Sequence, residues 1–148
     1  MSKPYAYLTQ STPQFITPIA SPIVFDNPSN PPLNANWFIY DATNNTIQFL
    51  VAGTYAIDLN LSSFAGGTVT VNAVLKLTPP VTGVTSTVPG SGIVYNVSGP
   101  STLTLASNNL VAVAQFQTLA VNVSISEGVG AYTTARNNGG TTLRIIQI

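Results

Sequence analysis

Hydrophobic and polar residues alternate along much of this chain, which is the pattern of β-strands that bury one face. The alternation is clearest in residues 54–61, 68–77 and 119–125. The residues expected to point inward are Tyr55, Ile57, Leu59 and Leu61 in the first segment, Val69, Val71, Ala73, Leu75 and Leu77 in the second, and Leu119, Val121, Val123 and Ile125 in the third. On the first segment, Asp58 and Asn60 face the other way. Each segment is therefore predicted to be a strand with one buried face.

Two further segments, 109–117 and 142–148, are apolar on both faces over most of their length. Strands that are apolar on both sides are covered on both sides. In a two-sheet sandwich the second cover is most simply another subunit, so these strands predict self-association. The residues expected to pack in the core or at a trimer contact are Tyr55, Ile57, Leu110, Phe116, Leu143 and Ile145.

Turn residues separate the predicted strands at short intervals. The signals are Gly53, Gly66-Gly67, Pro79-Pro80, Pro89-Gly90, residues 107–109 and residues 138–140. Thr, Val, Ile and Tyr are abundant, whereas Glu, Lys and Arg are nearly absent, so the composition favours strands over helices. A chain with about ten short strands in this spacing is expected to be an all-β, antiparallel jelly-roll sandwich without a helix longer than one turn.

Residues 1–36 differ from the rest because prolines interrupt them throughout. These are Pro4, Pro13, Pro18, Pro22, Pro28, Pro31 and Pro32. Proline restricts a segment to edge strands and extended loops, so only short strands are expected here, at 5–7, 14–17 and 22–25. The predicted division is an extended N-terminal arm with the first short strands, 1–21, followed by a jelly-roll head, 22–148.

The beginning of this arm is the candidate connector between copies of the chain. Its residues are Met1, Ser2, Lys3, Pro4, Tyr5 and Tyr7. Proline keeps the segment extended, so little entropy is lost when it docks, and tyrosine offers a large contact area with few rotatable bonds. Two alternatives stay open for residues 5–7: they anchor the arm on a neighbouring subunit, or they form the first strand of the head.

The low content of charged residues predicts that the domain associates with copies of itself. Only four Lys and Arg and four Asp and Glu occur among 148 residues, which is 5%, and the formal net charge is zero. Globular domains normally carry roughly a quarter of their residues as charged side chains. A surface with so little charge barely repels copies of itself, so association is favoured. We therefore expect much of the outer surface to be covered by other copies.

The composition also excludes several kinds of chemistry. The chain has no cysteine and no histidine, which removes disulfides, thiolate nucleophiles, the usual general base and nearly all zinc sites. Four scattered cations cannot form the basic stripe that nucleic-acid binding needs. No apolar run approaches the roughly 18 residues of a membrane span. The start, Met-Ser-Lys-Pro-Tyr, lacks the features of a signal peptide, so release by lysis or deposition from the cytoplasm is expected.

The four carboxylates do not form a recognisable catalytic pair; they are Asp26, Asp41, Asp58 and Glu127. Asp26 and Asp41 stand beside Asn-rich turns, where such side chains usually bond to the local backbone. Calcium binding by Asp41 with Asn44 and Asn45 is an alternative, but the dense acidic loop of calcium sites is missing. The sequence therefore predicts no enzyme activity, no metal and no cofactor.

Three stretches together resemble a known family. They are residues 5–7 (YAY), 46–57 (TIQFLVAGTYAI) and 142–148 (TLRIIQI). The second resembles the strand–turn–strand signature of tumour necrosis factor-like and complement-type globular heads. In being rich in Thr, Val, Gly and Asn and poor in charged residues, the chain is similar to the C-terminal heads of Bacillus collagen-like exosporium glycoproteins. The resemblance implies a jelly roll of about ten strands that forms tight trimers. Unlike those proteins, this chain has no collagen-like Gly-X-Y tract.

Two functional hypotheses follow from these observations. The first is a non-enzymatic, self-assembling trimer of a bacterial spore surface layer or appendage fibre, whose partners are other copies of itself or another spore coat or anchor protein. The second is a phage or adhesin head that binds a receptor or a carbohydrate through the loops near 62–67, 79–91 and 137–140. The aromatic residues Trp37, Tyr40 and Tyr95 are too dispersed in sequence to support the second hypothesis.

Overall fold

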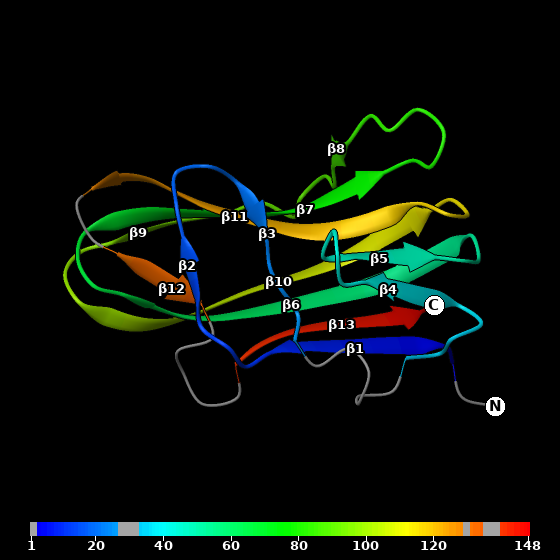
Figure 1. Cartoon of the computed structure of the whole chain (residues 1–148), viewed down its shortest axis with the longest axis horizontal. Coiled ribbons are helices and arrows are strands. Elements are labelled where there is room, and N and C mark those ends of the chain that lie inside the picture. Colours follow the sequence, from blue (N-terminus) through cyan, green and yellow to red (C-terminus); the bar gives the residue numbers. More distant parts are fainter. Residues whose placement is uncertain (1–2, 27–32, 129–130, 135–139) are drawn as a thin grey trace.

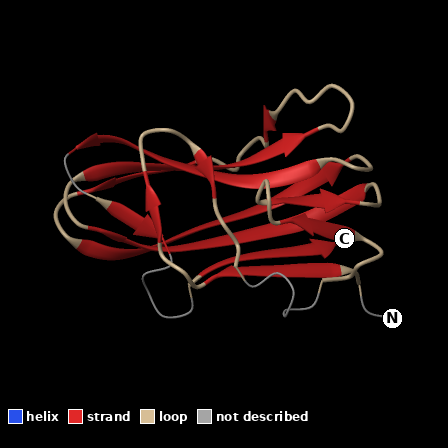
Figure 2. Cartoon of the chain, in the orientation of Figure 1, coloured by secondary structure: helices blue, strands red, loops and turns tan. Residues whose placement is uncertain are grey.

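The computed structural model describes residues 3–26, 33–128, 131–134 and 140–148. These residues form strands, turns and loops, and no helix occurs among them (Figure 2). The strands pair in two antiparallel sheets that face each other as a sandwich (Figure 1). The prediction of an all-β jelly-roll sandwich is therefore confirmed.

The first sheet contains six strands. They are β1 (Tyr5–Gln10), β2 (Gln14–Ile16), β6 (Gly53–Ala65), β10 (Ser101–Val113), β12 (Tyr132–Thr134) and β13 (Thr141–Gln147). The long β6 pairs with β10 along its whole length, while β13 and β12 share its other edge. β1 extends the sheet beyond β13, and β2 extends it beyond β12.

The second sheet contains seven strands. They are β3 (Ser21–Pro22), β4 (Phe38–Asp41), β5 (Thr46–Phe49), β7 (Val69–Thr78), β8 (Ser86–Thr87), β9 (Ile93–Val97) and β11 (Thr118–Gly128). The sequence predicted about ten strands. The extra strands include β3 and β8, which have two residues each and are too short for any periodicity to show.

The core lies between the two sheets and contains the residues that the alternation predicted. Tyr55, Ile57, Leu59 and Leu61 on β6 and Val69, Val71, Ala73, Leu75 and Leu77 on β7 are all buried. On β11, Leu119, Val121 and Val123 are buried, and Ile125 is half-buried. The inward faces were therefore correctly predicted, because alternation reports burial directly.

Three aromatic rings fill one part of this core. Phe38, Phe49 and Tyr55 meet edge to face, with ring centroids 4.7 to 5.8 Å apart. The Tyr55 hydroxyl donates a hydrogen bond of 2.6 Å to the Val51 carbonyl, so its polar end is satisfied although the residue is fully buried. Burial raises the pKa of Tyr55.

The proline-rich beginning of the chain belongs to the sandwich from Tyr5 onward. β1 carries Ala6 and Leu8 into the core, where both are at most 1% exposed. Its outer edge is covered by the segment that precedes β4, through a bridge between Ala6 and Leu33. The predicted boundary between residues 21 and 22 falls inside β3, whose two residues pair with β11.

Candidate functional site

The outer face of the first sheet carries an apolar row that crosses four neighbouring strands. Tyr5 on β1 pairs with Ile146 on β13, Ile146 pairs with Ala56 on β6, and Ala56 pairs with Leu110 on β10. Their inward-facing neighbours, such as Ala6, Ile145 and Ile57, are fully buried, so this row faces away from the core. Leu110 is 73% exposed. A row of this kind is a surface that a partner can cover.

A polar row runs beside it, two residues further along each strand. It consists of Tyr7, Arg144, Asp58 and Asn108, which pair in that order. Arg144 donates to a carboxylate oxygen of Asp58 at 2.7 Å. With its amide nitrogen turned toward Asp58, Asn108 donates to the other carboxylate oxygen at 3.0 Å. Both oxygens of the Asp58 carboxylate are therefore paired.

The residues predicted for trimer or core packing separate into two groups. Tyr55, Ile57, Leu143 and Ile145 are at most 1% exposed and pack in the core of the chain itself. Leu110 and Phe116 are exposed, on β10 and in the turn that follows it. Only this second group is accessible to another copy.

The structure describes some of the predicted connector residues and not others. Tyr5 and Tyr7 lie in β1, which is the alternative in which they form the first strand of the head. Lys3 and Pro4 precede that strand, and Lys3 is exposed. Met1 and Ser2 lie outside the described residues.

The expectation that Asp26 bonds to its local backbone was wrong. Its carboxylate accepts hydrogen bonds from the backbone nitrogens of Ser11 and Thr12 at 2.6 to 3.1 Å, and from the Ser11 hydroxyl at 3.1 Å. Burial raises the pKa of Asp26, but these hydrogen bonds lower it more, so the net shift is downward. The side chain thus fastens the loop between β1 and β2, which sequence proximity could not show.

Asp41, by contrast, does hold a local turn. Its carboxylate accepts hydrogen bonds from the Asn44 side chain at 2.7 Å and from the backbone nitrogens of Thr43 and Asn44. The hydrogen bond from the Asn44 side chain is the main reason that the pKa of Asp41 is lowered. Among the described residues, no group of three or more acidic side chains could hold a metal ion. The geometry around Asp41 therefore gives no support to the hypothesis of calcium binding there.

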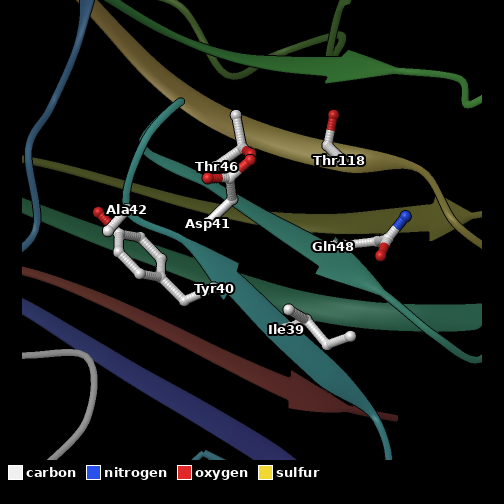
Figure 3. Close-up of a pocket in the computed structure, with 7 residues that line it drawn as sticks. All are labelled: Ile39, Tyr40, Asp41, Ala42, Thr46, Gln48 and Thr118. Atoms are coloured by element: carbon white, nitrogen blue, oxygen red, sulfur yellow. The ribbon is translucent and has the colours of Figure 1, made fainter.

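One shallow hollow lies over β4, β5 and the start of β11, with a volume of about 380 Å³ (Figure 3). Its lining residues are Ile39, Tyr40, Asp41, Ala42, Thr46, Gln48 and Thr118. Ile39 is 48% exposed, and the Tyr40 hydroxyl is already bonded to the Phe25 carbonyl at 3.1 Å. The hollow offers a carboxylate, an amide, two hydroxyls and one apolar wall, which is chemistry suited to a small polar ligand.

The three segments that were expected to bind a receptor or a carbohydrate differ in their structure. Residues 62–65 belong to β6, and 137–139 lie outside the described residues. The loop between β7 and β8 is exposed and carries Val81 and Val84 on its surface. No described helix is long and apolar enough to cross a membrane.

The comparisons with known proteins concern the fold. No family model and no curated protein sequence matches this chain. Solved structures do match it, and two of them match over nearly their whole length. Eiger TNF from S. frugiperda matches with a TM-score of 0.74 and 11% identity, over 100% of this chain and 94% of that chain. Murine APRIL at pH 5.0 matches with a TM-score of 0.74 and 12% identity, over 99% of both chains. This chain has a tumour necrosis factor-like jelly-roll fold.

That result confirms the family-level fold that residues 46–57 indicated. At 11 and 12% identity the likeness shows the tumour necrosis factor-like fold alone. Kinship with the exosporium heads stays a prediction.

Two features of the surface were missed by sequence reasoning. Ile146 and Ala56 join Leu110 in the apolar row, and Arg144 pairs with Asp58 beside it. The alternation of β13 and β6 marks these residues as outward-facing, but their alignment depends on the register between strands far apart in the chain. Only the paired strands reveal that they form rows.

Proposed function

We propose that this protein is a non-enzymatic structural subunit that assembles through its own sheet surfaces, as a trimer of a bacterial spore surface layer or appendage fibre. The apolar row of Tyr5, Ile146, Ala56 and Leu110 carries the proposal. Rows like this on an outer sheet face are stabilised when another surface covers them, at about 25 cal/mol per Å² of apolar area removed from water.

The partner best suited to this face is another copy of the chain. In the neighbouring polar row the positive charge of Arg144 and the negative charge of Asp58 balance each other. The whole chain is also neutral, and copies meet without long-range repulsion. A charged partner would find little to recognise here, whereas a second copy offers the same low charge density.

Three-fold symmetry and the spore location rest on the resemblance to the exosporium heads, whose family forms tight trimers. Residues Met1, Ser2, Lys3 and Pro4 are the proposed connector between heads. A spore coat or anchor protein is the proposed partner at the base of the assembly. Extended segments of this kind dock by adding to a sheet edge or filling a groove.

Light scattering on the purified protein tests the assembly directly. We expect a particle of three times the 15.4 kDa chain mass, or larger, at micromolar concentration. Negative-stain microscopy then distinguishes discrete trimers from periodic filaments. A stable monomer would exclude the proposal, because the covered interface of an obligate oligomer would be missing.

The hollow over β4 and β5 favours a second candidate function, a head that binds a receptor or a carbohydrate. Asp41, Gln48 and Thr118 present polar groups there beside the exposed Ile39. A glycan array tests this candidate, with Gln48→Ala as the variant expected to lose binding. Signal on the array together with discrete trimers would support the binding head over the fibre subunit.

A further inference from the structure

A second hollow lies where β1 ends and β2 begins, with a volume of about 290 Å³. Its lining residues are Gln10, Thr12, Pro13, Gln14, Val24 and Asp26. Gln10 is the most deeply buried of them, at 1% exposed, whereas Thr12 and Asp26 are exposed. Gln10 therefore forms the floor of the hollow, and Asp26 stands at its rim.

The Gln10 side chain has one acceptor that receives no hydrogen bond. Its Nε2 donates to the Gln14 Oε1 at 2.7 Å, and that oxygen also accepts from the Val24 nitrogen at 3.0 Å. The Gln14 Nε2 donates to the Pro22 carbonyl at 3.1 Å, which fixes the orientation of both amides. The Gln10 Oε1 is buried and has no hydrogen-bond partner. An unpaired buried acceptor destabilises the fold, so a donor supplied from outside the chain would be bound there.

The surface around this hollow is negatively charged. The Tyr40 hydroxyl donates to the Phe25 carbonyl at 3.1 Å, which places Tyr40 beside Asp26 as well as beside Asp41. Burial is the main reason that the pKa of Tyr40 is raised, and the negative charges of Asp26 and Asp41 raise it further. The pKa of Asp26 is lowered overall, so this carboxylate is ionised at neutral pH. The hollow therefore suits a ligand that is both a hydrogen-bond donor and a cation.

Lys3 is the cation of this chain that best complements the hollow. Among the described residues, Arg144 and Asp58 form the only ion pair, so Lys3 and Asp26 both lack an ionic partner there. Lys3 is exposed and precedes β1, whereas the Lys76 ammonium is already bonded to a neighbouring hydroxyl at 2.6 Å. A lysine ammonium is a compact charge with three donors, so one of them can reach a buried acceptor while another meets a carboxylate.

Lys3 cannot reach the hollow of its own chain. Gln10 is seven positions after Lys3, and an extended chain advances about 3.3 Å per residue, so roughly 23 Å separate them. The Gln147 nitrogen donates to the Pro4 carbonyl at 3.0 Å, so the chain before β1 continues in line with that strand. A lysine side chain spans only a fraction of this distance. A contact between Lys3 and the hollow must therefore come from a second copy.

We infer that the hollow at Gln10 binds the Lys3 ammonium of a second copy. The inference rests on the proposed function and names the place where its connector docks. Because the connector and the hollow are different surfaces, the contact is heterologous. It repeats from copy to copy and leaves a free connector at one end of the series and a free hollow at the other, as a fibre requires.

Lys3→Gln tests the inference in the full-length protein, with Lys76→Gln as the matched control. Each substitution removes one ammonium group, so both variants have the same net charge. Lys3 lies outside the strands, so the head should keep its fold and its trimer. We expect the concentration needed for filaments to rise about tenfold or more for Lys3→Gln and to stay at the wild-type value for Lys76→Gln.

A double-mutant cycle separates a direct contact from a general effect of charge. Asp26→Asn keeps an oxygen that accepts hydrogen bonds from Ser11 and Thr12, but it removes the charge. If Lys3 meets Asp26, the double variant should need no higher concentration for filaments than the weaker single variant, because the contact is lost only once. Independent effects of the two substitutions on filament formation would contradict a direct contact.

Chemical cross-linking detects the contact itself. A carbodiimide couples a lysine amine to a neighbouring carboxylate as an amide and takes up the water that is released. In filaments grown from a mixture of isotope-labelled and unlabelled protein, mass spectrometry should find peptides that join Lys3 of one label to Asp26 of the other. Discrete trimers should give no such mixed peptide.

The ways in which the inference can fail are distinguishable. Filaments of Lys3→Gln at the wild-type concentration, without the mixed peptide in the wild type, would overturn the inference while the proposed function stands; a water molecule would then be the donor to Gln10. A mixed peptide in discrete trimers would place the contact inside the trimer and overturn its role as a connector. Wild-type trimers that never associate further would overturn both the inference and the fibre.

Discussion

Arg144 and Asp58 are ion-paired at 2.7 Å across β13 and β6, in the middle of the sheet face that carries the apolar row. In a single chain their side chains are 57% and 22% exposed, respectively, and an exposed pair of this kind contributes only about 0–1 kcal/mol to stability. The pair gains importance if a second copy covers the face, because a charge left without its partner would then be buried.

We therefore expect Asp58→Asn and Arg144→Gln each to weaken the trimer far more than the loss of a surface pair would. The double variant should recover part of the loss, since neither charge is then left alone. A double-mutant cycle on trimer dissociation should give a coupling energy above about 1.5 kcal/mol. Lys76→Gln, on the other sheet, is the control. A coupling energy near zero would mean that the face stays in water.

Leu110→Asp should abolish the trimer without damaging the fold. The side chain is 73% exposed in the single chain, so a carboxylate there costs the isolated chain little. In a covered face the same carboxylate would be buried without a partner. Light scattering should show monomers, and circular dichroism should still show β structure. Val81→Asp, which changes an apolar residue that is 92% exposed on a loop, should remain trimeric. Trimers in both variants would remove Leu110 from the interface.

Assembly should be almost constant between pH 5 and pH 9. The chain has no histidine or cysteine, the pKa values of Asp26 and Asp41 are lowered, and that of Tyr132 is raised. A lowered carboxylate pKa stabilises the fold above the unfolded value of about 3.9, and this contribution is lost only as the pH falls below it. Moderate sodium chloride should not dissociate the trimer, because apolar contacts do not weaken with salt. Dissociation near pH 6 would contradict this picture.

Tyr132 should make the fold sensitive to alkali. Burial raises its pKa to about 12, although a hydrogen bond of 2.7 Å to the Ser63 hydroxyl opposes the shift. A raised pKa means that the stabilisation is complete below the unfolded value of about 10 and is lost as the pH rises toward 12. The free energy of unfolding should fall by on the order of 2–3 kcal/mol across this window.

The Tyr132→Phe variant isolates that effect. Its stability should fall less steeply between pH 10 and pH 12, as measured by urea unfolding at fixed pH values, because it has no phenol to ionise at that position. Tyr95→Phe, which changes an exposed residue of the other sheet, should follow the wild type. Equal slopes for wild type and Tyr132→Phe would show that the buried phenol does not titrate with unfolding.

The strands were predictable from the sequence because burial on one face leaves a local trace. Tyr55 and Ile57 were placed inward from their spacing alone, and the structure has both in the core. The same reasoning could not decide whether Tyr55 or Leu110 faces a partner, since both are apolar residues on strands. That distinction depends on which side of each strand the other sheet covers.

The remaining features depend on contacts between distant segments. Asp26 was read as a local turn residue, but its carboxylate fastens Ser11 and Thr12. The left-handed Phe116 has no sequence signal, because glycine or asparagine would be the residue expected there. Both cases arise where tertiary contacts override local preference, which is where sequence reasoning is weakest.

The pairing of β1 with β13 has a consequence for how the protein is made. Of the described strands, β1 pairs with β13, near the other end of the sequence, and Ala6 and Leu8 of β1 lie in the core. During synthesis β1 must therefore wait until the ribosome has released β13, with its apolar side chains exposed in the meantime. Contacts between such distant segments also slow folding. The first sheet can therefore be completed only after β13 has been synthesised.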